Sequence, residues 1–228
     1  GKDSMLLAKL FEELHKHSNI NFEVIYLVMN PGYNKVNLDL IKHNLKYLNI
    51  NAEIVNTDIF SVTDNAGGSP CYLCARMRRG ALYRLAQERG CNKIALGHHF
   101  DDVIETTLLN ILNAGSFQTM LPKLHSDNFE NMELIRPMYL IREKDIIAWK
   151  EACELEFIRC ACRMTESIEN ELEHDLNSKR HETKQLIKSL TKYNDNVEKN
   201  IFKSASNVNL DKVLGYKKGK NTYSFLDN

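Results

Sequence analysis

The 228-residue sequence has no excess of either charge, no long apolar run and no internal repeat. Thirty basic residues balance thirty acidic ones, so net charge does not indicate a nucleic-acid-binding protein. No apolar run approaches the roughly 20 residues that a membrane-crossing helix needs, and no charged start followed by an apolar segment suggests secretion. We therefore expect a cytoplasmic protein without membrane association.

The chain is also not cysteine-rich, with six cysteines in 228 residues. Six cysteines would suffice for three disulfides in an oxidising compartment, but a CxxC pair in a chain without a secretion signal is more often a metal or redox site. We expect reduced thiols. The composition of the chain, 43% hydrophobic and 26% charged, is enough for one hydrophobic core with a smaller appended lobe.

Positive charge is clustered although the total is zero. Between Lys179 and Lys220 there are eleven Lys or Arg residues against four Asp or Glu. A second cluster includes Arg78 and Arg79, close to the CxxC pair. These two arginines are candidates for contacts with RNA phosphates, and a solvated helix face is an equally open interpretation. RNA therefore stays a candidate partner.

Alternating strand and helix patterns run through the first 140 residues. The run Phe22–Val28 ends at Asn-Pro-Gly and predicts a buried strand with a turn. Further strands are predicted at 52–55, 93–96 and 134–138, and helices at 38–48, 75–89 and 102–113. This alternation favours a parallel α/β sheet. We expect an α/β domain over 1–140, and the motifs that it carries indicate a nucleotide as its ligand.

The pattern changes after Pro137. Helices are predicted at 143–155 and 179–192, followed by an irregular basic tail rich in Asn, Lys and Gly. We expect residues 141–228 to form a helical, basic C-terminal region.

The chain opens with Gly1-Lys2-Asp3-Ser4, directly before residues with the apolar spacing of a helix. The backbone N–H groups and positive dipole end of a helix start suit a phosphate, and Lys2 adds a positive charge. This is not a GxxxxGK[ST] loop, because Asp follows the lysine. A simple helix cap is the alternative interpretation.

A dense polar group follows the predicted strand at 93–96. It consists of Gly97, His98, His99, Asp101 and Asp102. Ligands of open α/β sheets bind at strand carboxyl ends, and two carboxylates beside a triphosphate can hold Mg²⁺. His98 is the candidate donor to the α-phosphate. Either aspartate is also well placed to cap the next helix, and we favour His98 and Asp102 over His99 for function.

Cys71 and Cys74 have the spacing at which two thiolates bind one metal or cluster. Cys160 and Cys162 are candidates for further ligands. Zinc, a redox disulfide and an iron–sulfur cluster all remain compatible with the CxxC pair. Four sulfur ligands favour structural zinc, whereas three with an open position favour a catalytic cluster.

The GKDS helix start with a later GHHxDD resembles the PP-loop ATP pyrophosphatases, whose loop reads SGGKDS. Residues 70–124, which include PCYLCARMRRGALY and KIALGHHFDD, are similar almost throughout to the TtcA-like tRNA 2-thiocytidine synthetases. The resemblance implies a Rossmann-like parallel sheet of the PP-loop (adenine nucleotide alpha hydrolase-like) type with a helical C-terminal appendage. It also implies a Ser-Gly and a first strand before Gly1, so we expect the printed phosphate loop to be incomplete.

The resemblance further implies roles for individual residues. Catalysis would involve Lys2, Asp3, His98 and Asp102. ATP and Mg²⁺ binding would involve Gly1, Lys2, Asp3, Ser4, Met29, Gly97, His98, Asp101 and Asp102. A [4Fe-4S] cluster would be held by three cysteines from Cys71, Cys74, Cys160 and Cys162. Whether Cys160 or Cys162 is the third ligand stays open, and zinc is the lesser alternative.

The activity implied is ATP-dependent thiolation of a cytidine in tRNA, through adenylation, release of pyrophosphate and replacement of oxygen by cluster-delivered sulfur. The implied partners are tRNA, ATP, a sulfur donor such as a cysteine desulfurase, and a second copy of the chain. One alternative is another PP-loop tRNA-modifying enzyme that acts on a different base or performs lysidine-type ligation. Others are a non-catalytic zinc- and RNA-binding module and a nucleotide-binding protein without turnover.

Overall fold

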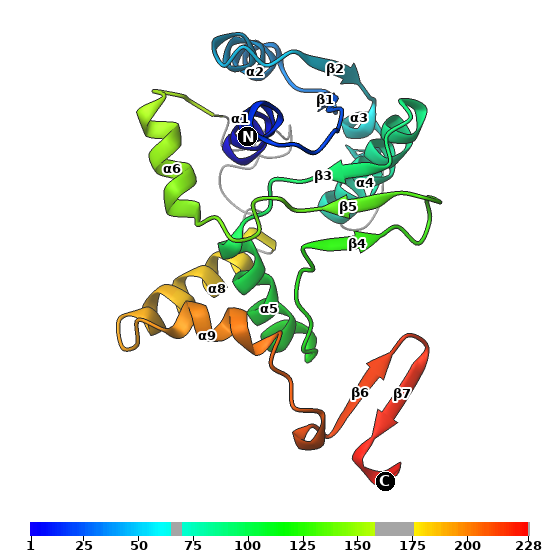
Figure 1. Ribbon diagram of the computed structural model, residues 1–228, viewed down its shortest axis with the longest axis vertical. Helices are drawn as coiled ribbons and strands as arrows, with labels where there is room; N and C mark the ends of the chain where they lie inside the picture. Colours follow the sequence, from blue (N-terminus) through cyan, green and yellow to red (C-terminus); the bar gives the residue numbers. More distant parts are fainter. Residues whose placement is uncertain (65–69, 158–175, 228) are drawn as a thin grey trace. The chain divides into compact units, whose positions relative to one another are not determined.

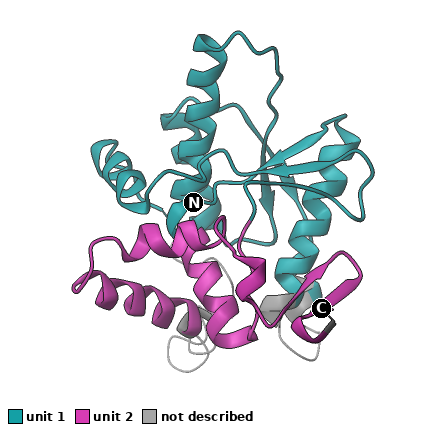
Figure 2. Ribbon diagram, turned by 60° about the horizontal axis from the view of Figure 1, so that its bottom comes forward, with its two compact units in different colours: residues 1–102, 121–178 teal, residues 103–120, 179–228 magenta. Residues whose placement is uncertain are grey.

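The computed structural model describes the backbone of residues 1–64, 70–157 and 176–227, without the side chains of residue 61 and of a few residues next to the gaps. Contacts divide the chain into two compact units, residues 1–102 with 121–178 and residues 103–120 with 179–228 (Figure 2). Contact density alone does not define independently folding domains, so the division predicted at residue 140 stays a prediction.

The first unit contains two small sheets (Figure 1). In one, β1 (Tyr26–Asn30) and β2 (Ala52–Asn56) pair in parallel along their whole length. In the other, β5 (Glu133–Ile135) pairs in parallel with β3 (Lys93–Ala95) and antiparallel with β4 (Lys123–His125). The predicted parallel α/β arrangement is confirmed. The antiparallel β4 was not predicted, and the β1 ladder begins four residues later than the predicted strand.

Helices separate these strands. They are α1 (Lys2–His17), α2 (Lys35–Tyr47), α3 (Ile59–Asp64), α4 (Pro70–Glu88), the first turn of α5 (Phe100–Ala114), and α6 (Glu143–Ala152). Local chemistry sets the start of α2, because the Asn34 side chain accepts a hydrogen bond of 2.8 Å from the backbone N–H of Asn37. None of the helices within the described ranges is long and apolar enough to cross a membrane.

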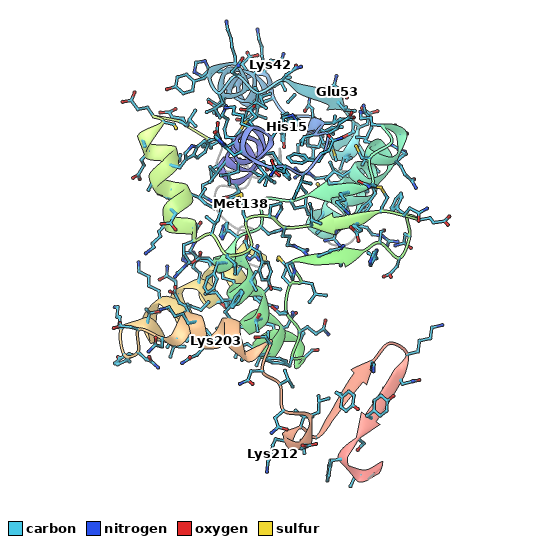
Figure 3. The ribbon with its side chains drawn as sticks, in the orientation of Figure 1. His15, Lys42, Glu53, Met138, Lys203 and Lys212 are labelled. Carbon is cyan, nitrogen blue, oxygen red and sulfur yellow. The ribbon has the colours of Figure 1, made fainter. Side chains whose placement is uncertain are left out.

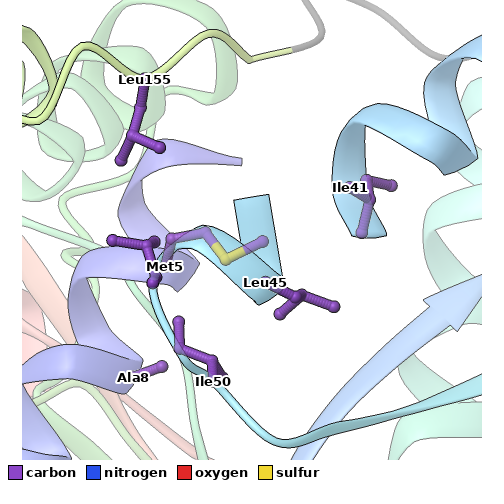
Figure 4. Close-up of a cluster of buried hydrophobic side chains, with 7 residues drawn as sticks. Met5, Ala8, Ile41, Leu45, Ile50 and Leu155 are labelled. Carbon is purple, nitrogen blue, oxygen red and sulfur yellow. The ribbon is translucent and has the colours of Figure 1, made fainter. Parts of the chain in front are cut away.

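Helix α1 lies at the centre of the first unit and buries two faces. Met5 and Ala8 pack with Ile41 and Leu45 of α2 (Figure 4). On another face, Leu6 and Leu7 pack with Met138 and with Ile146 of α6, both of which are fully buried. A third cluster joins Tyr83 of α4 to Met132 and to Leu134 of β5. The first turn of α1, which carries GKDS, is therefore held from two sides.

The second unit is mainly helical, like the C-terminal appendage that the sequence predicts. It contains the rest of α5, α8 (Leu176–Thr191) from Lys179 onwards, α9 (Val197–Ser204) and the short η1 (Leu210–Lys212). Arg180 of α8 joins the helices by an ion pair with the buried Glu105 of α5, at 3.3 Å between Nε and Oε2, and by a hydrogen bond to Thr106.

The basic tail is more regular than expected. β6 (Gly215–Lys218) and β7 (Asn221–Ser224) form an antiparallel hairpin, followed by η2 (Phe225–Asp227). The prediction of an irregular segment was wrong here, because Gly219 has a positive φ of 61° at the start of a two-residue turn. Glycine adopts this conformation readily, so the Gly- and Lys-rich composition suits a hairpin.

Candidate nucleotide-binding site

The two sequence motifs are in direct contact. Gly97, which follows β3, lies against the backbone of Asp3 in the first turn of α1. A Cβ added at Gly97 would be 3.0 Å from both the carbonyl carbon and the carbonyl oxygen of Asp3. A larger residue would force α1 and the turn apart. The absence of a side chain at Gly97 thus allows the GKDS helix start and the GHHFDD turn to form one site.

Lys2 carries a positive charge at the start of α1. Its Nζ lies 2.9 Å from Asp3 Oδ1 and 3.5 Å from Oε1 of Glu143, the first residue of α6. Partial burial disfavours the ammonium form, but the hydrogen bonds and attraction from Asp3 and Glu143 outweigh it and raise the pKa of Lys2. The ammonium group therefore stays protonated at neutral pH.

His99 is the most deeply buried polar side chain of the GHHFDD turn, with 5% of its surface exposed. Three carboxylates surround its ring, at 3.4 Å for Asp102, 3.8 Å for Asp101 and 4.0 Å for Asp3. Its buried Nδ1 has no hydrogen-bond partner among the described residues. Although the sequence favoured His98 over His99, His99 occupies the position at which the carboxylates of both motifs meet.

The two aspartates of the turn have different partners. Asp102 accepts a hydrogen bond of 3.1 Å from the backbone N–H of His99 and so caps the start of α5. Asp101 accepts bonds from Arg142 at 3.1 and 3.3 Å, and a bond of 2.7 Å from the backbone N–H of Glu143. Asp101 thereby caps α6. Burial disfavours its charge, but Arg142 and Glu143 outweigh burial and lower the pKa of Asp101.

Arg136 was not singled out from the sequence, yet the structure places it in the site. Its Nε donates to His98 Nδ1 over 3.3 Å, and its Nη1 donates to the carbonyl oxygen of Leu121. Because a guanidinium can only donate, Nδ1 of His98 acts as acceptor and the neutral ring carries its proton on Nε2. Burial lowers the pKa of Arg136, and the nearby charge of Arg79 acts in the same direction. The available signal was the position of Arg136 immediately after β5.

Three helix N-termini converge on these side chains. Lys2 belongs to the first turn of α1, Asp101 and Asp102 to that of α5, and Glu143 to that of α6. Each N-terminus has a partial positive charge, although at α6 the side chain of Asp101 already accepts the N–H of Glu143. Together with the ammonium of Lys2, this arrangement suits a multiply charged anion such as a nucleotide triphosphate.

The other residues predicted to bind the nucleotide lie at the start of α1 and in β1. Gly1 is the N-cap of α1, Ser4 is exposed in its first turn, and Met29 is buried in β1. In the part of the chain that the structure describes, no three His, Cys, Asp or Glu side chains are arranged to hold a metal ion. The magnesium ligands therefore stay a prediction.

The cysteine site is described only in part. Cys71 and Cys74 lie near the start of α4, three residues apart along its backbone, and Cys74 is partly buried. The side chain of Cys71 and all of Cys160 and Cys162 lie outside the described residues. A separation of three residues brings two side chains of a helix onto one face, which two ligands of one metal or cluster require.

The family model of the PP-loop domain matches residues 1–176 of the chain. The chain belongs to the PP-loop family. The match covers α1 and the GHHFDD turn, which form the candidate site. It confirms the resemblance based on GKDS and GHHxDD, and with it the Rossmann-like fold class of the PP-loop type.

Relatives within the PP-loop family are similar over most of the chain. The tRNA-cytidine(32) 2-sulfurtransferase of Geotalea uraniireducens (strain Rf4) is 35% identical over 211 residues, which span 91% of this chain and 80% of the relative. The protein of the same name from Coxiella burnetii (strain CbuG_Q212) is 35% identical over 222 residues, 95% of this chain and 82% of the relative. The resemblance to the TtcA-like group is thereby confirmed.

One solved structure supports the fold independently. The U34-tRNA thiolase NcsA from Methanococcus maripaludis, solved with its [4Fe-4S] cluster, superposes with a TM-score of 0.68 at 23% identity. The similarity covers 90% of this chain and 67% of that protein. At this identity the likeness shows a shared fold.

Proposed function

We propose that the protein is an ATP-dependent tRNA sulfurtransferase that converts a cytidine in tRNA to 2-thiocytidine. The observation that carries this proposal is the contact between Gly97 and Asp3, which joins two phosphate-site motifs where three helix N-termini meet. The names of the relatives supply the substrate class. The enzyme would act in the cytoplasm, as a homodimer, with a cysteine desulfurase as sulfur donor.

Binding of ATP follows from the charges in the site. The ammonium of Lys2 and the N–H groups of the first turn of α1 would hold the β- and γ-phosphates, with Gly1, Ser4 and Met29 completing the nucleotide contacts. His98 would donate its Nε2 proton to the α-phosphate, since Arg136 occupies Nδ1. These groups neutralise the charge that develops as pyrophosphate leaves.

The chemistry is an exchange of oxygen for sulfur on the base. The O2 of cytosine attacks the α-phosphorus of ATP, the bond to the β-phosphate oxygen breaks, and pyrophosphate leaves. Adenylation is needed because a carbonyl-type oxygen is a poor leaving group, whereas AMP is a good one. The protein's contribution is to align the base with the phosphate and to hold water away.

Magnesium fits the donor set in the site. Asp3 and Asp102 supply the carboxylate oxygens that Mg²⁺ prefers, and both approach the same ring of His99. Asp101 is held by Arg142 and Glu143, so we place it as support for these ligands. When bound there, Mg²⁺ would supply positive charge that offsets the negative charge of the phosphates.

The cysteines fit a cluster as far as their backbone is described. Cys71 and Cys74, with one of Cys160 and Cys162, would hold [4Fe-4S], which when bound supplies an iron position for sulfide. The segment of α4 just beyond these cysteines carries Arg79, whose charge acts on Arg136. Helix α4 would thus connect the cluster with the nucleotide site.

The first experiment measures iron, acid-labile sulfide and zinc per chain, on anaerobically prepared protein. Roughly four irons and four sulfides are expected, together with tRNA-dependent pyrophosphate release and 2-thiocytidine in the product. Cys71→Ala should lose the iron. One of Cys160→Ala and Cys162→Ala should lose it as well, and that variant identifies the third ligand. Cys153→Ala, at a partly buried cysteine, is the control. One zinc without sulfide would overturn the proposal.

A further inference from the structure

The β6–β7 hairpin is a feature that the proposed chemistry does not use. Its register pairs Gly215 with Ser224 and Lys218 with Asn221. Glycine is needed at the first residue of β6 and at the turn residue directly after β6. A Cβ at Gly215 would be 2.6 Å from the carbonyl oxygen of Tyr223, and Gly219 begins the turn with a positive φ of 61°. The hairpin is therefore a specific local structure, although nearly all of its residues are exposed.

One face of the hairpin carries a pair of stacked tyrosines. Tyr216 and Tyr223 are directly opposite each other, with ring centroids 4.7 Å apart and an angle of 12° between the rings. The two residues are 37% and 39% exposed. Because side chains alternate along a strand, Lys218 and Asn221 share the face of the tyrosines. An ammonium group and an aromatic platform are thus presented together.

The charged side chains of the hairpin itself all have one sign. Residues 215–224 include lysines at 217, 218 and 220 and no Asp or Glu. Lys217, Lys218 and Lys220 are all exposed on the hairpin, and Lys212 precedes it in η1 (Figure 3). A ligand that matches this surface is a polyanion with flat rings along its length. Single-stranded nucleic acid has this chemistry.

We infer that the β6–β7 hairpin binds a single-stranded segment of the tRNA substrate, with a base stacked on the tyrosine pair and the lysines beside the phosphates. This inference rests on the proposed function, which supplies tRNA as the substrate. A stacking platform tolerates any base, so the hairpin adds affinity and not sequence specificity. It is a substrate-binding element, separate from the groups that carry out adenylation.

The first test compares two triple variants of the full chain. Lys217→Gln/Lys218→Gln/Lys220→Gln removes the hairpin charges, and Lys35→Gln/Lys42→Gln/Lys46→Gln removes the same charge from exposed positions on α2. For unmodified tRNA at about 0.1 M salt, the hairpin variant should bind roughly tenfold more weakly. Its slope of log K against log salt should fall by about 2, since each lost single-strand phosphate contact contributes about 0.7. The α2 variant should stay within about twofold of wild type.

The second test addresses the tyrosines. Tyr216→Phe/Tyr223→Phe keeps the stacked rings and should bind like wild type, whereas Tyr216→Ser/Tyr223→Ser should bind several-fold more weakly. In the wild-type protein, a single-stranded oligonucleotide should shift the ring-proton resonances of both tyrosines, and a blunt RNA duplex should not. This readout does not depend on whether the serine variant keeps its hairpin.

Kinetics separate this inference from the proposed function. In the thiolation assay the lysine and serine variants of the hairpin should raise the KM for tRNA and leave kcat at saturating tRNA unchanged. Wild-type turnover together with unchanged tRNA affinity in both hairpin variants would overturn the hairpin inference alone. Absence of tRNA binding and of pyrophosphate release in the wild-type protein would overturn both. A change of oligomeric state without a change in RNA affinity would assign the hairpin to self-association instead.

Discussion

At the scale of single residues, Gly97 decides whether the GKDS helix start and the GHHFDD turn can be in contact, because it has no Cβ. We expect Gly97→Ala to lower ATP-dependent pyrophosphate release by at least tenfold, because a Cβ 3.0 Å from the Asp3 backbone displaces the first turn of α1 by a few tenths of an ångström. Steady-state pyrophosphate release measures the effect. Gly80→Ala on α4 is the control, because a Cβ there meets no atom within 4 Å. Gly90→Ala is unsuitable, since Gly90 has a positive φ. Equal loss in the Gly80 variant would contradict the explanation.

Arg136 should act on the reaction through His98. We expect Arg136→Met to lower kcat for pyrophosphate release by about tenfold or more, because His98 then loses the donor that fixes its tautomer. Arg136→Lys should restore part of the rate, since an ammonium can still donate to Nδ1. The KM for ATP should change less than kcat. Full turnover in Arg136→Met would show that the hydrogen bond has only a structural role.

Residue types were predictable from the sequence, but their partners were not. The GHHFDD spacing indicated that an aspartate caps a helix, and Asp102 does cap α5. That Asp101 caps α6 instead, through Arg142 and Glu143 some 40 positions later in the chain, depends on a tertiary contact. Local patterns contain no information about such contacts. For the same reason Arg136 was overlooked, since its partner His98 lies in a different loop.

At the scale of elements, Glu133 connects the three strands of the second sheet. Hydrogen bonds from Lys123 on β4 and Lys93 on β3 lower the pKa of this carboxyl from 4.5 to about 2. A lowered pKa in the folded state means that the contribution to stability is complete above about pH 4.5 and is lost as the pH falls towards 2. We expect Glu133→Gln to be less stable than wild type at pH 7, with a difference that shrinks over this interval.

Urea unfolding at a series of pH values measures the Glu133 effect. High salt should reduce the difference, because the three charged groups are close to solvent. Glu130→Gln, at an exposed position three residues earlier, is the matched control and should behave like wild type. A difference that persists unchanged at pH 2 would exclude the ion pairs as its source.

The elements that the sequence missed are those without a strong pattern. β4 has only three residues, too few for an alternation of apolar and polar side chains to stand out. The β6–β7 hairpin is formed by Lys, Asn, Tyr and Gly, and almost none of it is buried. By contrast, α1 and α5 were predicted well, because each begins at a polar motif and continues with apolar residues at helical spacing.

At the scale of the whole molecule, a mutation within the second compact unit should lower the stability of that unit and leave the stability of the first unit unchanged. We expect Arg180→Met to destabilise it by about 1–3 kcal/mol, because the buried Glu105 then loses a charged partner. Hydrogen exchange should accelerate in α8 and in α5 beyond Asp102. Amides of β1 and β2 should keep their wild-type rates. Uniform acceleration throughout the chain would show that the two units unfold together.

Family and fold class were accessible from short motifs, since a phosphate site constrains backbone and sequence together. The length of the match at residues 70–124 identified the TtcA-like group, and the relatives at 35% identity bear this out. The two compact units were not foreseen in this form. Residues 121–157 return to the first unit after α5, and such a return depends on contacts distant in sequence.

The convergence of three helix N-termini has a practical consequence for work with the purified protein. A site built to attract phosphate groups does not distinguish strongly between a nucleotide and small inorganic anions. Sulfate or phosphate buffers would occupy the position intended for ATP and would appear as competitive inhibitors in rate measurements. Buffers with bulky organic anions, and chloride as the only salt, are the appropriate choice for every assay described above.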